Sequence, residues 1–344
     1  MSPKNLNAQN KTHRLLLKKL KDKRISQIYK RFEKNFKLNQ NFIVAVSGGA
    51  DSLALSFLTK VYSIKNSLTV KYYIVDHKLR DNSTLETKLV KDLLKKNFIN
   101  IDILNWNGKK PVSNIQSTAR KKRYKLLINK AKKLKINNIL TAHHIDDLYE
   151  NFFIRILRGS GLRGLASFDK NAYYDKINFL RPLIEFEKED LVYITNKVFM
   201  YYIKDPSNDD DKFTRVRIRK LLKNLRLEGL NKKKFFLTIR NLKFSNETIK
   251  FYTEKNLKDN SSFLKRKNST ILKKEFFNQP EEVLFRSLME IIKSVGKKYY
   301  NVRGKKLDNI IKLIISNKKS DFKLSIGNCI VKKVNNSIIV SKEQ

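Results

Sequence analysis

Short apolar runs alternate with longer amphipathic segments through the first half of the chain. Runs rich in Val, Ile and Phe are typical of strands, and they cover residues 42–46, 70–75, 101–106, 138–142 and 177–182. Segments with helical periodicity follow, over residues 53–64, 85–97, 115–134 and 187–198. Because the strands are apolar throughout, this alternation predicts an α/β fold with a parallel sheet covered by helices on both faces.

The second half has a different pattern. From residue 213 the chain is densely basic and helical, and we expect residues 230–318 to form helices, most clearly 235–252 and 281–292. The tail alternates as short strands over 322–326, 330–334 and 337–340, with a hairpin turn at Asn335-Asn336. The Lys/Asn-rich stretch Asn256–Lys267 is the best candidate for a mobile loop.

These patterns predict four parts of the chain. A basic N-terminal helical segment covers 1–38, an α/β domain 39–228, a helical region 229–318 and a small β segment 319–344. We expect the first part to pack on the domain or contact RNA, with a transit peptide as the alternative.

The charge of the chain points to a polyanionic partner. Its 344 residues carry a formal net charge of +43, and 41% of them are hydrophobic, enough for a real core. Nucleic acid is the first candidate partner and an anionic membrane surface the second. The alternative is that lysine serves here as a generic solubilising surface residue.

Cysteine content and hydropathy exclude several classes of protein. The single cysteine, Cys329, leaves no disulfide framework, no Cys-rich zinc cluster and no Cys-based sulfur relay within the chain. No apolar run approaches the roughly 18 residues of a membrane helix, and the N-terminus has no signal-peptide core. We therefore expect a protein of a reducing compartment, the cytoplasm.

The hexapeptide S-G-G-A-D-S, Ser47–Ser52, follows the first strand directly. Its glycines can adopt positive φ, and the loop amides with the following helix N-terminus form a site for a phosphate-sized anion. Asp51 at its rim could hold Mg²⁺ on a polyphosphate. The segment lacks the lysine of a mononucleotide P-loop. The alternative is an ordinary βα turn with Ser or Asp as helix cap.

Two further segments carry candidate ligand contacts. The second strand ends in V-D-H-K-L-R, which places Asp76 and His77 where the base or ribose of a nucleotide would lie, with Arg80 in reach of a phosphate. His77 could equally be structural. In A-R-K-K-R-Y, Arg120 and Arg123 share a helix face and form either a fork for an anion or a solvated basic stripe.

The fourth strand ends in T-A-H-H-I-D-D-L-Y-E-N, Thr141–Asn151. His143, Asp147 and Glu150 are typical of a metal site, for Mg²⁺ rather than zinc. Together with Asp146 the acids could instead bind a cationic substrate and accept its proton, or simply cap a helix. The glycine-rich basic segment Arg155–Leu165 follows and suits an anionic surface.

In combination these segments resemble the PP-loop ATP pyrophosphatases, and more narrowly the tRNA(Ile)-lysidine synthetase family. The match comprises five segments in the family's order over residues 42 to about 220, the last being D-P-S-N-D-D-D-K-F-T-R. The resemblance implies a Rossmann-like PP-loop domain of the adenine nucleotide alpha hydrolase type, followed by a mainly helical region and a short β tail.

The resemblance also implies a reaction. Members activate the wobble cytidine of a CAU-anticodon isoleucine tRNA with ATP, release pyrophosphate, and let the ε-amine of free lysine displace AMP. By this resemblance the ATP site comprises Ser47, Gly48, Gly49, Ala50, Asp51, Ser52, Asp76 and His77, with Mg²⁺ on Asp51. The catalytic residues are Asp51, Asp146, Asp147, Glu150 and Arg120, of which the acids of 146–150 handle lysine and its proton. Anionic groups are contacted by Arg120, Arg123 and Arg158. The further residues expected to contact lysine or tRNA are His143, Arg163, Arg215 and Arg219, with Arg217 another candidate for RNA phosphate.

The resemblance has limits that define the alternatives. The family usually has Gln, Thr and Asn where this chain has Leu148, Asn151 and Val216. Longer relatives carry a larger C-terminal tRNA-binding part, so residues 229–344 correspond to a reduced version. A homodimer is a further possible partner arrangement. The alternatives are another PP-loop tRNA-modifying enzyme such as a thiolase, or a non-catalytic RNA-binding protein.

Overall fold

The computed structural model describes residues 13–79, 82–108, 111, 115–166, 171–204, 210–264, 268–297, 302, 304–316, 322–334 and 337–343. It divides into two compact units, Met1–Asn231 and Lys232–Gln344. Arg80, residues 205–209 of the D-P-S-N-D-D-D-K-F-T-R segment and the Asn335-Asn336 turn lie outside the described residues. None of the helices within the described ranges combines the length and the apolarity needed to cross a membrane.

The first unit is built on a six-stranded sheet with the order β3-β2-β1-β4-β6-β5. All neighbouring strands are parallel except β5, which pairs antiparallel with β6. The predicted parallel sheet is therefore confirmed, and β5 is an addition that the apolar pattern did not indicate. The strands are β1 (Phe42–Val46), β2 (Val70–Asp76), β3 (Ile101–Asn105), β4 (Asn138–Leu140), β5 (Asn171–Tyr174) and β6 (Ile177–Leu180).

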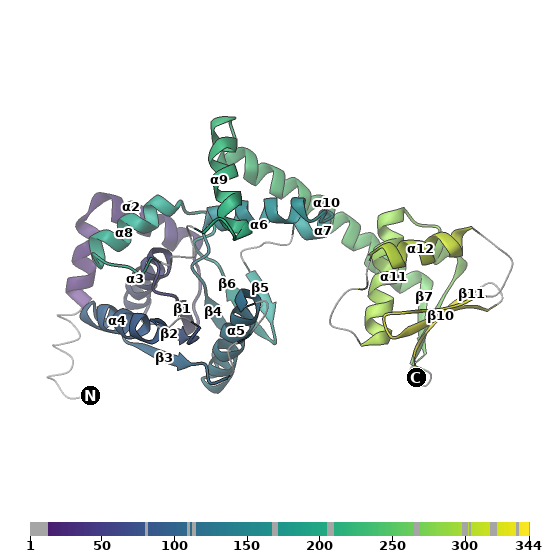
Figure 1. Ribbon diagram of the computed structural model, residues 1–344, viewed down its shortest axis with the longest axis horizontal. Helices are drawn as coiled ribbons and strands as arrows, with labels where there is room; N and C mark the ends of the chain where they lie inside the picture. The colour runs from purple at the N-terminus through teal and green to yellow at the C-terminus, as the bar shows by residue number, and fades with distance from the viewer. Residues whose placement is uncertain are drawn as a thin grey trace. The chain divides into compact units, whose positions relative to one another are not determined.

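Helices cover both faces of this sheet, as the continuous apolar strands require (Figure 1). In β1, Phe42 and Val44 belong to a core shared with α2, α3, α4 and α8, whereas Ile43 packs with α5 on the other face. Alternate residues of a strand point to opposite faces, so this division follows directly from the pleat. The helices are α2 (Lys23–Asn35), α3 (Ala50–Lys65), α4 (Ser83–Lys96), α5 (Ile115–Lys133) and α8 (Lys188–Val198).

The described part of the basic N-terminal segment packs on this domain, which was the first of its predicted roles. After the short 3₁₀ turn η1 (Lys19–Lys21), helix α2 lies against α8. Arg24 and Arg31 each place a guanidinium nitrogen 3.1 Å from a carboxylate oxygen of Asp190. The hydroxyl of Tyr193 donates to Oδ2 of Asp22 at 2.8 Å. These contacts explain why so basic a segment can form an ordered helix.

The strand order creates a switch point beside β1. The chain runs from β1 outward through β2 to β3 and then crosses back by α5 to β4, on the other side of β1. The segments that follow β1 and β4 therefore leave the same edge of the sheet as neighbours, the usual position of a ligand site in open α/β sheets. Helix α6 (Ile145–Leu157) begins at this edge, and α9 (Thr214–Leu227) and α7 (Leu162–Leu165) both contact α6.

The second unit contains helices and an antiparallel five-stranded sheet of order β7-β8-β11-β10-β9. Its core includes Leu272 of β8, Leu288 of α11 and Val340 of β11, all fully buried. The elements are α10 (Lys232–Asn260), β7 (Ser261–Leu264), β8 (Ser269–Leu272), η4 (Lys274–Phe277), α11 (Glu281–Gly296), α12 (Gly304–Ile315), β9 (Lys323–Ile326), β10 (Cys329–Val334) and β11 (Ser337–Lys342).

Two expectations for this unit were wrong. Residues 230–318 are not all helical, because β7 and β8 extend the sheet of the predicted β tail through the pairing of β8 with β11. Residues 256–264 do not form a loop either: α10 continues to Asn260 and β7 follows. Asn256 is 2% exposed, and its amide donates to the carbonyl of Phe276 at 3.2 Å and to Ser287 Oγ at 3.1 Å. Residues 265–267 lie outside the described residues.

Candidate active site

The turn after β1 requires glycine at Gly48. Its φ is +87°, a conformation that residues with a Cβ rarely adopt. A Cβ there would lie 2.8 Å from Val90 Cγ2 and 3.0 Å from Ile203 Cδ1. The carbonyl of Gly48 also accepts from the amide of Ile203 at 3.0 Å. The turn is thus fixed between α4 and the segment that follows α8.

The hydroxyl of Ser52 organises the amides of this turn. Ser52 Oγ accepts from the backbone N–H of Ser47 and of Gly48, each at 3.1 Å, and donates to the carbonyl of Gly49 at 2.9 Å. Helix α3 begins at Ala50, so the first-turn amides of Ala50 and Asp51 lack the i−4 carbonyls that amides use inside a helix. A helix start of this kind favours an anion.

Asp51 connects this turn with the segment after β4. Its Oδ2 lies 3.6 Å from Nε2 of His144, so the paired-glycine turn and the acidic segment are in direct proximity. Burial raises the pKa of Asp51 and Asp147 adds to the rise, against the opposing charges of His144 and Lys188. Oδ1 of Asp51 is buried and has no hydrogen-bond partner among the described residues.

Such an oxygen suits a cation, which would compensate its buried charge. Within the described part of the chain, no group of three or more His, Cys, Asp or Glu side chains could hold a metal by itself. The predicted His143–Asp147–Glu150 metal site is therefore wrong, because Glu150 is paired with arginines instead. Mg²⁺ commonly takes only one or two carboxylates and completes its shell with phosphates and water, and Asp51 fits that pattern.

The start of α6 forms a reciprocal cap. Nδ1 of His144 accepts from the backbone N–H of Asp146 at 3.3 Å, and Oδ2 of Asp147 accepts from the backbone N–H of His144 at 2.9 Å. Burial would raise the pKa of Asp147, but His144, His143 and this hydrogen bond together lower it. Asp147 thus has the capping role that was the plainer alternative, and it remains ionised beside Asp51.

His143 lies on the neighbouring side of the same segment. Its Nδ1 is 2.9 Å from Thr141 Oγ1. Burial lowers the pKa of His143 to about 4, with Asp147 opposing and Arg181 and Arg120 adding to the fall. The imidazole is therefore neutral near pH 7 and can donate or accept one hydrogen bond at each nitrogen, according to its tautomer.

The remaining acids of α6 are paired with arginines of α9, which lies beside α6 (Figure 1). Arg219 Nε donates to Glu150 Oε1 at 2.5 Å, and Arg215 Nε lies 4.0 Å from Oε2. Arg226 pairs with Asp146. Glu150 is 2% exposed, and burial raises its pKa although Arg219 opposes the rise. Glu150 was expected to act on lysine and Arg215 and Arg219 on RNA, but the structure joins them as ion pairs.

Comparison with known proteins shows the family to which the chain belongs. The model of the PP-loop domain family matches residues 18–225. A tRNA(Ile)-lysidine synthase of Wolbachia pipientis wMel is 32% identical over 311 residues, which cover 89% of this chain and 71% of the relative. One of Rickettsia akari is 31% identical and covers 92% of this chain and 74% of the relative. The chain belongs to the tRNA(Ile)-lysidine synthase family.

Another relative matches a shorter part of the chain at higher identity. The synthase of Orientia tsutsugamushi is 39% identical over 197 residues, which cover 57% of this chain and 44% of that relative. Among solved structures, the U34-tRNA thiolase NcsA from Methanococcus maripaludis, described with its [4Fe-4S] cluster, has a TM-score of 0.56 at 18% identity. It covers 66% of this chain and 81% of the thiolase, and at that identity it supports the fold alone.

The two residues at the end of β2, Asp76 and His77, have different environments. Asp76 accepts from Ser83 Oγ at 2.8 Å, Thr84 Oγ1 at 2.7 Å and the amide of Lys78 at 3.1 Å. These bonds lower its pKa although burial acts to raise it, so both of its oxygens serve the start of α4. His77, in contrast, lines a small pocket together with Ser47 and Arg123. That pocket is where the sequence placed part of a nucleotide.

Three other predicted arginines, Arg120, Arg158 and Arg163, lie on α5, at the end of α6 and on α7. Arg120 donates to the hydroxyl of Tyr124 at 3.0 Å. Arg158 is the C-cap of α6, about 16 Å along the helix axis from Asp147 at 1.5 Å per residue. Arg158 and Arg163 are both exposed. The carbonyl of Gly164 is held instead by Arg155 Nη1 at 2.7 Å.

At two of the three positions that depart from the family pattern, an apolar side chain is buried: Leu148 on α6 and Val216 on α9. At the third, Asn151 Oδ1 accepts from Arg155 Nε at 2.9 Å.

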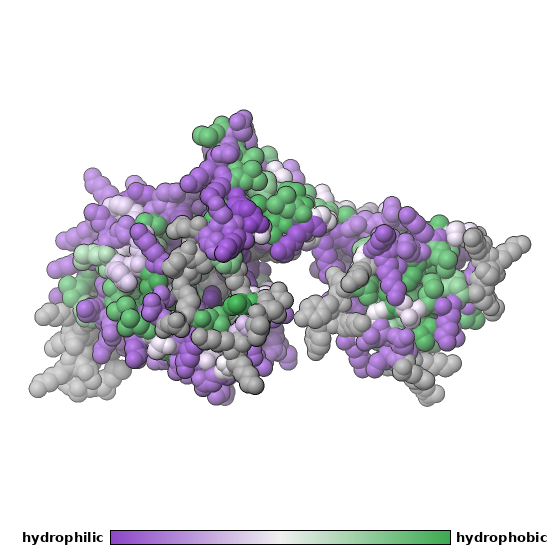
Figure 2. Space-filling model, viewed as in Figure 1, coloured by the Kyte–Doolittle hydropathy of each residue, from purple (hydrophilic) through white to green (hydrophobic). Residues whose placement is uncertain are grey.

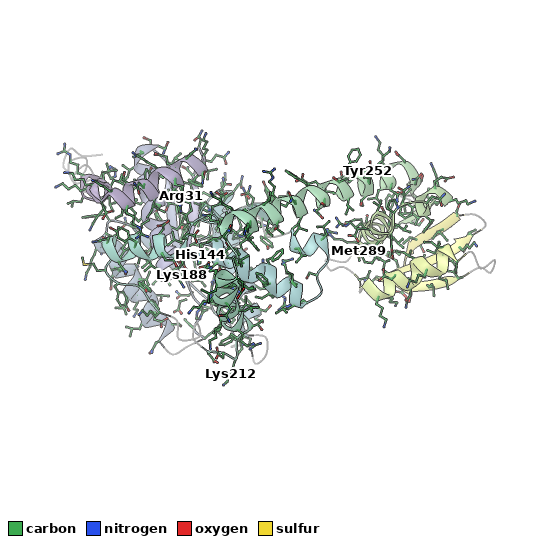
Figure 3. The ribbon with its side chains drawn as sticks, turned by 90° about the horizontal axis from the view of Figure 1, so that it is seen from above. Arg31, His144, Lys188, Lys212, Tyr252 and Met289 are labelled. Atoms are coloured by element: carbon green, nitrogen blue, oxygen red, sulfur yellow. The ribbon has the colours of Figure 1, made fainter. Side chains whose placement is uncertain are left out.

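Sequence reasoning missed His144, Lys188 and Arg226 as members of the site (Figure 3 labels the first two). It selected His143 from the His143-His144 pair, because nothing local tells which imidazole turns toward Asp51. One local signal did favour His144. It directly precedes the acids that begin a helix, which is the position of an N-cap residue. Arg226 lies 80 residues from its partner Asp146, and no local pattern joins the two.

Proposed function

We propose that the protein ligates lysine to C2 of the wobble cytidine of a CAU-anticodon tRNA(Ile), forming lysidine with release of AMP and pyrophosphate. The first step adenylates the cytidine, and the ε-amine of lysine then displaces AMP. The observation that carries this proposal is the proximity of Asp51 in the glycine turn to His144 in the acidic segment, at 3.6 Å. An anion site and a cation site then share one edge of the sheet.

ATP is proposed to bind with its phosphates at Ser47–Ser52. The amides at the start of α3 offer hydrogen bonds to phosphate oxygens, and the pocket of His77 and Arg123 receives part of the nucleoside. Asp51 would hold Mg²⁺ through its unpartnered buried Oδ1, and the ion would supply charge neutralisation on the transferred phosphates.

Lysine is proposed to bind beside the acids of α6. Its ε-amine must lose a proton before it attacks, and a carboxylate with a raised pKa accepts a proton more readily at neutral pH. The pKa of Glu150 is raised by burial, while the pKa of Asp147 is lowered by its histidine neighbours and cap bond. Glu150 is therefore the better proton acceptor, and Asp147 the better permanent negative charge.

The tRNA is proposed to contact exposed cations of both units. In the first unit these include Arg158, Arg163 and Arg215. The second unit, Lys232–Gln344, would add contacts from its basic helices. The net charge of +43 supports a polyanionic partner, and binding should weaken steeply with salt. A cytoplasmic location is part of the same proposal.

A thiolase reaction is less well supported. An iron–sulfur cluster such as the one in the thiolase structure needs several cysteine ligands, and this chain has only Cys329, which is buried in the second unit.

One assay separates the candidates. The protein is incubated with ATP, radiolabelled lysine and a set of tRNAs, and both label in tRNA and pyrophosphate are measured. Lysidine formation predicts label only in the CAU tRNA(Ile), with one pyrophosphate released per lysine incorporated. An RNA-binding protein without activity would shift the tRNA in a gel but release no pyrophosphate, and that result would refute the proposal.

A further inference from the structure

One face of α9 is committed to the acids of α6. Arg215, Arg219 and Arg226 are spaced by four and seven residues, which places them on the same side of the helix. Arg219 holds Glu150 Oε1 at 2.5 Å, Arg215 approaches Oε2 at 4.0 Å, and Arg226 pairs with Asp146. Residues Thr214–Leu227 contain no acid at all. The charged side chains that the helix presents to the carboxylates of the site are therefore all cations.

In these ion pairs, arginines hold the carboxylates that a cationic amino acid would otherwise bind. Glu150 is almost completely buried, so a second cation at its carboxylate would lie within a few ångströms of the guanidinium of Arg219 with little water between them. Like charges repel strongly at that distance in a poorly solvated site. At Asp146 the repulsion from Arg226 is weaker, because both side chains are partly exposed to water. An incoming ammonium group must therefore displace the arginines or share the carboxylates with them at a cost.

The arginines themselves remain within reach of a second partner. The side chains of Arg219 and Arg226 are 35% and 42% exposed. The surface over α9 is largely hydrophilic (Figure 2), and Arg217 on the opposite side of the helix is exposed. Guanidinium groups bind phosphates in the same two-pronged geometry that they use for carboxylates. A polyanion bound along α9 would compete with Asp146 and Glu150 for these groups.

We propose that Arg219 and Arg226 occupy the lysine-binding carboxylates until RNA phosphates draw α9 away, so that tRNA binds before lysine. This inference rests on the proposed function and adds the order of substrate binding to it. The arginines are positioning residues here, since they act through Asp146 and Glu150. The ion pairs also stabilise the substrate-free protein, because a buried carboxylate without a paired cation raises the free energy of the folded state.

The test measures the affinity of the full chain for radiolabelled lysine by equilibrium dialysis, without ATP so that no reaction occurs. With wild-type protein, saturating CAU tRNA(Ile) should tighten lysine binding by about tenfold, the effect of removing one competing charged hydrogen bond. Without tRNA, Arg226→Gln should tighten lysine binding by a similar factor, because the variant removes the cation that is paired with Asp146. Arg219→Gln is measured in the same way and should also tighten lysine binding, because it removes the cation that is paired with Glu150.

The matched control is Arg217→Gln, which removes the same charge from the opposite side of α9. Arg217 contacts the carbonyls of Asp211 and Lys212, and its variant should leave lysine affinity without tRNA unchanged. In the double variant Arg219→Gln/Arg226→Gln, tRNA should add little further affinity.

One outcome would overturn the inference and leave the proposed function intact. In it, lysine is incorporated into tRNA, but the affinity for lysine is the same with and without tRNA. Weaker or unchanged lysine binding by both single variants would do the same. Absence of lysine binding in every arm, together with absence of incorporation, would overturn both.

Discussion

Replacing Gly48 by alanine tests the packing of the turn that the whole site depends on. The φ of +87° costs a residue with a Cβ about 1–2 kcal/mol. The new Cβ would also lie 2.8 Å from Val90 Cγ2 and 3.0 Å from Ile203 Cδ1, and such overpacking typically costs about 1–3 kcal/mol. We expect Gly48→Ala to destabilise the first unit by about 3 kcal/mol, or about 1 M urea at the midpoint.

The only tryptophan, Trp106, makes the measurement specific. It is buried in the first unit, and its amide donates to the carbonyl of Asp76 at 2.9 Å, so its fluorescence in urea follows the unfolding of that unit. The matched control is Gly49→Ala. Gly49 has a φ of −75°, and a Cβ there would have its nearest neighbour, Ser47 Oγ, at 3.9 Å. This variant should lose less than about 1 kcal/mol. Equal midpoints for the two variants would refute the reasoning.

The other predictions concern Asp51, Asn256 and Asp76. Asp51→Ala should abolish lysine incorporation and leave tRNA affinity in a filter assay nearly intact; full turnover by the variant would remove Asp51 from the mechanism. Asn256→Ala should lower the stability of the second unit by about 2 kcal/mol in thermal melts, because two buried hydrogen bonds are lost. The pKa of Asp76 is lowered by folding, so its stabilising effect is present above about pH 3.9 and is lost as the pH falls. The stability difference between wild type and Asp76→Asn should therefore shrink in acid, and a constant difference would contradict this.

The features predicted from sequence are those that local chemistry decides. The run Phe42–Val46 is apolar at every position because both of its faces are buried, and that pattern can be read without any knowledge of the neighbouring strands. The need for glycine at Gly48 follows from a tight turn between a strand and a helix. The strand order then brings the segments after β1 and β4 together, as the general rule for ligand sites in such sheets anticipates.

The features that were missed depend on partners distant in sequence. Glu150 and Arg219 are 69 residues apart, and their pairing changes Glu150 from a presumed open carboxylate to one already neutralised by an arginine. Asn256 looked like a loop residue because its polarity suggests exposure, but Ser287 and Phe276 satisfy its amide in the interior. Strand β8 is too short to stand out in the sequence, and its pairing with β11 joins segments separated by α11 and α12.

The central claim is that the glycine turn and the acids of α6 form one site, in which ATP and lysine meet over a cytidine. A crystal structure of the full chain with Mg²⁺, lysine and α,β-methylene-ATP, whose α–β bond resists cleavage, tests it most directly. The account predicts phosphates at the amides of Ser47–Ser52, the ion on Asp51, and the lysine amine beside Asp147 and Glu150. Lysine bound elsewhere, or phosphates away from the start of α3, would contradict it.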